Sequence, residues 1–407
     1  MSVGNWIRIG DSRTNLQTTL GMHAGIGIES MNERLGKICF LPPPMDTPWV
    51  GAPAENRSIQ VERTDGNLVS LKLPLFWYDP PWSEVEIDSA DAIAGAVARL
   101  GVLVSALRSD LASADDEPEL HGARPAETIG VQVQATEDLP RIIPYRPERY
   151  GLSDRDFDGA AVVDVRLAMR RNPTGRFAYT PEEIGRWEAT QAESPLAGGG
   201  WVPAASFPPD VEGIEKLKGK LNQLRLLAGD AAVFVSMAPH RLNEELPAVL
   251  CSQPDGVILR LNELDLNALE LAHCVKKTRA MMDEKQCEHL PLWVVPGEVS
   301  AADAAKLIAL GANAVAIDSW CQELVKEIRD AQQNANSTSG YASLSAPKTQ
   351  EWVDWVEDEL FRHIERFDGL MHAMMYQPPE DRLATLSAEW ASRLSIPTLS
   401  VPFDAGS

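Results

Sequence analysis

A chain of 407 residues can bury one large core or two smaller ones, and its 44% hydrophobic and 24% charged residues are those of an ordinary globular protein. The net charge of −22 argues against nucleic acid as a partner, because phosphate backbones bind basic surfaces. The N-terminus lacks a signal-peptide core and no apolar run approaches a membrane span, so we expect a cytoplasmic protein without a membrane partner.

The first 70 residues are rich in proline and glycine and show no hydrophobic period. We therefore expect residues 1–70 to form an irregular covering segment. The apolar stretch Leu71–Tyr78 predicts a first strand. Ser89 is the expected N-cap of a helix that ends at Gly101, and Val102–Leu107 is β-branched enough to predict a second strand.

The middle of the chain alternates between apolar strands and amphipathic helices, which is typical of a parallel α/β fold. The expected strands are Ile129–Gln134, Ala160–Leu167, Ala232–Met237 and Gly256–Leu261, and the expected helices are Val211–Leu227, Leu242–Leu250 and Leu266–Met282. The long glycine-containing segment 168–205 predicts a loop that covers the active face of such a fold.

One strand–helix–strand unit is especially clear. Leu292–Val295 predicts a buried strand, and Ser300 predicts the N-cap of an alanine-rich helix with Asp303 in its first turn. Gly311 ends this helix where positive φ is usually needed, and Ala314–Ile317 predicts the next strand. Such crossovers build parallel sheets, and in a barrel the last two strands carry the phosphate site.

These elements predict an α/β fold, a TIM-type (β/α)8 barrel over residues 71–331 with a helical C-terminal extension. The polar stretch 332–350 predicts a linker, and residues 351–407 form the expected extension. Within the extension, Glu351–Met375 has the apolar spacing of a long amphipathic helix, and Glu380–Leu394 predicts a second helix.

Gly297, Asp303, Gly311, Ala312 and Val315 fall in the pattern S-G-G-x-R-T-G-x-D-V, helix, G-A-D-x-V-x-x-G. On these residues the chain resembles the FMN-binding domain of glutamate synthase and its short relatives. The resemblance continues in order through most of the chain with weak identity. It implies a barrel, FMN as cofactor, and glutamate formed from 2-oxoglutarate and ammonia, with the ammonia supplied by a partner chain.

The positions that would hold the flavin phosphate have changed. Pro296 replaces the first glycine and has no N–H to donate, and Val299 replaces the arginine. Glu298 and Asp318 place carboxylates where a phosphate is expected, which predicts repulsion.

The positions around the flavin ring have changed as well. Arg166 and Ser236 replace two lysines, and Asp164 lies where the family has glutamate. The family's glycine-rich loop becomes a stretch that starts at Arg260 and includes the bulky Leu264. Of the three cysteines that hold an iron–sulfur cluster in full-length enzymes, only Cys321 is present, so we expect no cluster.

The histidines and remaining cysteines give weak signals. A metal site at His273, Cys274, Cys287 and His289 is not favoured by their spacing. His240 follows a predicted strand and is the lone histidine best placed for an acid–base role. The catalytic candidates are Arg166, Asp164 and His240, and the cofactor-binding candidates are Gly297, Ser300, Ser236, Arg260, Asp318 and Ser319.

Two functions remain open from the sequence. The favoured hypothesis is a catalytically degenerate relative of the glutamate synthase FMN domain, without FMN, acting as a structural or regulatory subunit or through a repurposed pocket. The alternative is an active FMN-dependent oxidoreductase of the same kind. Either would function as a homo-oligomer or with a partner amidotransferase or oxidoreductase subunit.

Overall fold

The computed structural model describes most of the predicted barrel and extension. The described residues are 33–41, 58–85, 87–107, 140–145, 152, 154–167, 178–179, 202–203, 211, 213–262, 264–337, 349–375 and 382–399. The predicted strand Ile129–Gln134 and most of the predicted loop 168–205 lie outside these residues. From that loop the structure describes only the short antiparallel pair β8 (Ala178–Tyr179) and β9 (Val202–Pro203).

Eight parallel strands close into a barrel, which confirms the predicted fold class. In barrel order they are β4 (Leu75–Trp77), β5 (Leu103–Ser105), β6 (Arg141–Tyr145), β7 (Ala160–Arg166), β10 (Ala232–Met237), β11 (Gly256–Arg260), β12 (Leu292–Val295) and β13 (Ala314–Ala316). The barrel closes where Val315 of β13 pairs with Leu75 of β4. The carboxyl ends of all eight strands therefore meet at one end of the barrel.

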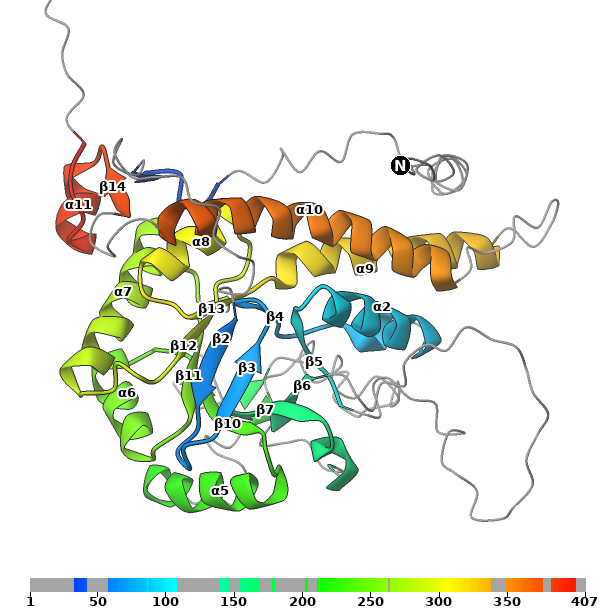
Figure 1. Cartoon of the computed structure of the whole chain (residues 1–407), viewed down its shortest axis with the longest axis horizontal. Coiled ribbons are helices and arrows are strands. Elements are labelled where there is room, and N and C mark those ends of the chain that lie inside the picture. Colours follow the sequence, from blue (N-terminus) through cyan, green and yellow to red (C-terminus); the bar gives the residue numbers. More distant parts are fainter. Residues whose placement is uncertain are drawn as a thin grey trace, which may run out of the picture.

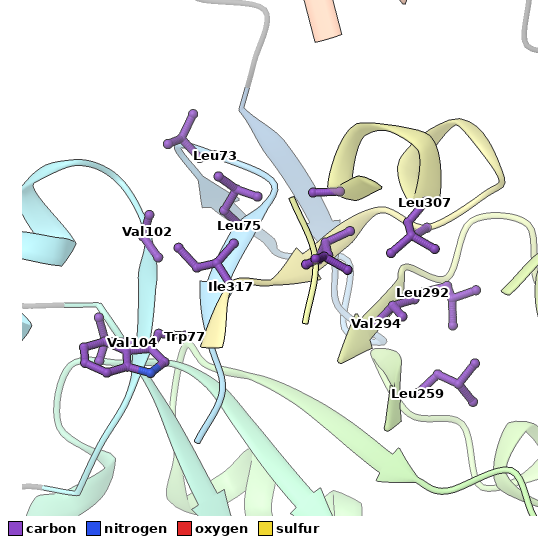
Figure 2. Packing of buried hydrophobic residues seen from close by; sticks show 14 of the residues in the cluster. Leu73, Leu75, Trp77, Val102, Val104, Leu259, Leu292, Val294, Leu307 and Ile317 are labelled. Atoms are coloured by element: carbon purple, nitrogen blue, oxygen red, sulfur yellow. The ribbon is translucent and has the colours of Figure 1, made fainter. Parts of the chain in front are cut away.

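Helices surround the barrel. They are α2 (Ile87–Arg99), α5 (Ile214–Leu227), α6 (Leu242–Cys251), α7 (Ala268–Glu284), α8 (Ala301–Ala309) and α9 (Asp318–Ser337), and Figure 1 shows their arrangement. The larger part of the core lies between strands and helices. Figure 2 shows Leu307 of α8 above Leu292 and Val294 of β12, all of them fully buried.

A second apolar cluster fills the inside of the barrel. Trp293 of β12 stacks between Phe76 of β4 and Phe234 of β10, with ring centroids 4.9 and 4.6 Å away. Alternate residues of each strand point inward, as in other closed barrels. At the amino ends of the strands this cluster is completed by Val61 and Leu71.

Val61 and Leu71 belong to a hairpin in the segment that we expected to be irregular. Its strands are β2 (Ile59–Glu62) and β3 (Leu68–Leu71), which pair antiparallel. The hairpin covers the amino end of the barrel. Its signal in the sequence is the Asp65-Gly66 turn, where Gly66 has a φ of +83°.

Two further predictions about individual elements are wrong, and one strand was missed. Ser89 is not an N-cap but lies inside α2, which already begins at Ile87. Strand β6 was missed because Pro144 lies within it and proline is rare in central strands. Helix α9 continues to Ser337, so its last residues fall in the expected linker.

The C-terminal extension is attached to the barrel along its whole described length. Helix α10 (Thr349–Met375) lies across α2, α8 and α9 (Figure 1), and its predicted apolar stripe, including Trp352 and Phe367, is buried. None of the described helices is both long and apolar enough to cross a membrane.

The predicted helix Glu380–Leu394 is instead a strand followed by a short helix. Strand β14 (Leu383–Thr385) pairs antiparallel with β1 (Ile38–Phe40), and Ser387 then caps α11 (Ala388–Leu394) by accepting from the N–H of Trp390. The capping serine and the pairing with β1 override the helical spacing of the leucines.

Asp303 fastens the N-terminal segment to the barrel. Ser300 is the N-cap of α8, as predicted, and Asp303 forms a capping box with it. The fully buried carboxylate also accepts from the N–H groups of Arg34 and Leu35, at 3.0 and 2.7 Å. One side chain thus satisfies backbone donors of two segments that lie far apart in the sequence.

We expect Asp303→Ala to lower the free energy of unfolding by roughly 3–5 kcal/mol, because several N–H groups lose their acceptor. Urea denaturation measures this loss. Asp330→Ala, at an aspartate with 52% side-chain exposure on α9, is the matched control and should change stability by less than about 0.5 kcal/mol. Equal stability of the two variants would refute the role given to Asp303.

Candidate functional site

Several of the predicted site residues meet at the carboxyl end of the barrel. Each projects inward from the end of a strand, which is where (β/α)8 enzymes place their active sites. They are Asp164 and Arg166 of β7, Ser236 of β10, Arg260 of β11, and Asp318 directly after β13.

Arg166 is the centre of this group. The side chain is 2% exposed, and its Nε donates to the Oδ2 atom of Asp164 at 2.8 Å. Nη2 donates to the carbonyl of Tyr78 at 2.8 Å and to Ser105 at 3.3 Å, while Nη1 lies 3.4 Å from Asp79. Burial opposes its charge, but the groups around it, including the carboxylates of Asp164 and Asp79, outweigh this effect and raise the pKa of Arg166. The guanidinium therefore stays positively charged, and most of its N–H groups already donate hydrogen bonds within the protein.

Tyr78 occupies the middle of the barrel mouth. Its ring lies under the guanidinium carbons of Arg166 and Arg260, at 3.9 and 5.1 Å from the ring centroid. Its hydroxyl donates to Ser236 at 3.0 Å. Burial raises the pKa of Tyr78, so the phenol stays neutral and acts as a hydrogen-bond donor. Cation–π contacts of this kind are strongest when water is excluded.

Asp318 lies at the point where barrels of this type bind phosphate. Its Oδ1 atom accepts from the N–H of Asp79 at 2.6 Å. Its Oδ2 atom is buried and has no hydrogen-bond partner among the described residues. Burial raises the pKa of Asp318 from 3.8 to about 6, and the nearby charge of Asp79 adds to this effect. A carboxylate is thus held where a ligand phosphate would need backbone donors.

The remaining predicted residues lie beside α8. Gly297 has a φ of +82°, a value that favours glycine. The N–H and hydroxyl of Ser300 both bond to Asp303, and Ser319 accepts from the N–H of Val299 at 3.4 Å. Glu298 is exposed, so water weakens the repulsion that we expected from it. The N–H groups of Ser300 and Asp303 at the start of this helix are therefore bonded to the protein's own side chains.

His240 lies away from this group. It lines a surface hollow of about 410 Å³ together with His273 and Cys274. Burial raises the pKa of the Cys274 thiol to about 11, which leaves it neutral and a poor metal ligand. Among the described residues no three histidine, cysteine or acidic side chains are arranged to hold a metal ion.

The sequence analysis missed the residues that connect the site. Tyr78, Asp79 and Ser105 each contact Arg166, yet none was a candidate. A signal for Tyr78 was present, because it follows the inward-facing Phe76 by two positions and must point the same way at the end of its strand.

The fold and this ring of polar residues define a (β/α)8 barrel with a charged, closely packed mouth. The solved structure of the recombinant flavin-binding domain of baker's yeast flavocytochrome b2 is similar, with 14% identity over 91% of this chain and 80% of that chain and a TM-score of 0.47. Mandelate oxidase with (S)-2-phenylpropionate has 13% identity over 88% of each chain and a TM-score of 0.45. At these values the likeness concerns the barrel alone and transfers no activity.

No family model and no curated protein sequence matches the chain. The resemblance to glutamate synthase therefore stays a prediction from the residues quoted above.

The residues present do not fit FMN. A flavin phosphate needs backbone donors at the loops after β12 and β13, but Pro296 after β12 has no N–H, and after β13 the carboxylate of Asp318 lies at this place and accepts from the N–H of Asp79. A flavin ring needs space over the mouth, but Tyr78 and Arg166 pack there and are buried. Binding would have to break contacts that the chain already makes with itself.

We expect Asp318→Asn to stabilise the protein above about pH 6. Because the folded-state pKa lies above the unfolded value, the folded chain retains a proton that the unfolded chain releases, and stability falls as pH rises from about 4 to about 6. The full penalty, roughly 3 kcal/mol, applies above this window. Asparagine keeps the acceptor for Asp79 without the charge.

Urea denaturation at a series of pH values measures the difference between the variant and the wild type. The difference should be near zero at pH 4 and reach its plateau near pH 7. A pH-independent difference for Asp318→Asn would show that its carboxyl is not destabilised in the folded state.

We expect Arg166→Met to cost about 3–5 kcal/mol, because Asp164 would remain buried without its cation. The double variant Arg166→Met/Asp164→Asn should recover part of this loss. A double-mutant cycle from urea denaturation gives the coupling. The control pair is Arg99 and Glu357, which are 46% and 34% exposed at 2.7 Å and should couple by at most about 1 kcal/mol. Similar coupling in both pairs would contradict the central role of Arg166.

Proposed function

We propose that this protein is a flavin-free (β/α)8 barrel that acts as a structural or regulatory subunit rather than as an oxidoreductase. The observation that carries the proposal is the carboxylate of Asp318, which takes the N–H of Asp79 at the position of the expected phosphate. A buried carboxylate and a phosphate dianion at one place repel each other, and the low polarity around them strengthens the repulsion.

The packing of the mouth supports the same proposal. Arg166 and Tyr78 are 2% and 0% exposed, and their contacts reach three barrel strands and the segment after β4. Separating a buried ion pair costs several kcal/mol. A flavin ring would have to displace this group and supply better contacts in its place. The network therefore serves to hold the barrel together.

The partner of such a subunit is a second copy of this chain or an amidotransferase or oxidoreductase subunit, as the sequence resemblance implies. Under the alternative, the chain would itself be an active FMN enzyme of glutamate biosynthesis, with Arg166 in place of the family's lysine. The two functions differ in one observable, which is the presence of bound flavin.

The absorption spectrum of the protein purified from cells grown with ample riboflavin tests the proposal. We expect no flavin band, and no rise in melting temperature on addition of FMN, because a ligand that binds the native state must stabilise it. Riboflavin, which lacks the phosphate, is the matched control. A yellow protein with stoichiometric FMN, or stabilisation by FMN but not by riboflavin, would establish the alternative.

A further inference from the structure

A groove outside the barrel mouth has the chemistry of an anion site. It lies between the start of α6, the middle of α7 and the short helix α11. Its first part, the hollow of about 410 Å³ already described, includes Arg241, Lys277 and Arg393 in its lining, and a neighbouring hollow of about 580 Å³ shares His273 and Arg393 with it. Both volumes are in the range of small-molecule sites.

Two polar contacts fix the position of α11 on α7. His273 Nδ1 donates to the carbonyl of Arg393 at 3.1 Å, and Lys276 Nζ donates to the carbonyl of Ser395 at 3.3 Å. These bonds satisfy carbonyl groups at the end of α11, where cations are favourable. The wall that carries the Arg393 side chain is thus held in place before any ligand arrives.

Two cations of the groove have no acidic partner. Neither Lys277 nor Arg393 forms an ion pair with any residue that the structure describes. The third cation, Arg241, lies 3.7 Å from Glu244, and both of those side chains are mostly exposed, so this pair is weak. The lining of the first hollow thus has three cations and one carboxylate, and the second hollow adds the carboxylate of Glu389 beside Arg393. In a chain with a net charge of −22, such a local excess of positive charge is unusual.

The start of α6 adds backbone donors to these cations. Leu242 and Asn243, the first two residues of this ten-residue helix, line the hollow. The side chain of the N-cap residue Arg241 makes no capping bond, while its N–H donates to Oε2 of Glu245 at 3.1 Å, and Glu244 and Glu245 place two carboxylates in the first turn. First-turn N–H groups and the helix dipole favour a negative ligand at this position and these carboxylates oppose it, so the cations of the groove are its main attraction for an anion.

We propose that this groove binds a small phosphate-bearing anion. Arg393 and Lys277 approach it from two helices, the start of α6 supplies N–H donors, and the size suits a single phosphorylated metabolite. A long polyanion such as nucleic acid is not favoured, because the chain as a whole has a net charge of −22. The groove is separate from the barrel mouth, so this proposal does not depend on whether the mouth binds a ligand.

Isothermal titration calorimetry with pyrophosphate, at low ionic strength and against a sodium chloride blank, tests the proposal. We expect binding to the full-length protein, weakened about tenfold by Lys277→Gln and again by Arg393→Gln, since each removes a charge-assisted contact. Lys326→Gln, at an exposed lysine on α9, removes the same charge elsewhere and should leave the affinity unchanged.

Three results would overturn the proposal. The first is the absence of pyrophosphate binding above the salt blank. The second is equal weakening by Lys277→Gln and Lys326→Gln, which would mean a general charge effect. The third is binding that neither Lys277→Gln nor Arg393→Gln changes, because the anion would then lie elsewhere, for example at the end of β13.

Discussion

The packing of the barrel mouth depends on the buried ion pair between Arg166 and Asp164. Two opposite charges at 2.8 Å, both almost fully buried, are costly unless their other hydrogen-bonding atoms also find partners. Tyr78 and Asp79, directly after β4, and Ser105 of β5 supply partners for Arg166, whereas Oδ1 of Asp164 has none among the described residues. The mouth is therefore filled by a structural network whose parts depend on one another.

Near the expected phosphate position, some backbone N–H groups likewise donate to carboxylates of the protein itself. Asp303 accepts from the N–H of Ser300 at the start of α8 and from those of Arg34 and Leu35, while Asp318 accepts from the N–H of Asp79. In a flavin barrel the ligand would be the acceptor at such places. Here two side-chain carboxylates have that role for the N–H groups just named. Lys277 and Arg393 at the groove near α11 differ, since neither has an ion-pair partner among the described residues.

The sequence predicts the parts of this fold that have local signals. The spacing of apolar residues predicted β10 and β12 to the residue, and Ser300 and Gly311 predicted both ends of α8. Long-range partners left no such signal. Nothing near Asp303 indicates that it also binds the backbone of Arg34, and nothing near Leu383 indicates a pairing with β1. Those contacts depend on how the whole chain folds, and so does the link through Tyr78 that joins the site residues.

The pairing of β1 with β14 has a consequence for synthesis on the ribosome. The hydroxyl of Thr385 donates to the carbonyl of Lys37, a partner 348 positions earlier in the chain. At about 5–20 residues per second, translation of this interval takes on the order of tens of seconds. During that time the strands that pair with β1 and with the open edge of β4 have not yet left the ribosome. Until the C-terminal segment has been synthesised, the unpaired edges of β1 and β4 need to be covered, either by a chaperone or by the β2–β3 hairpin of the same chain.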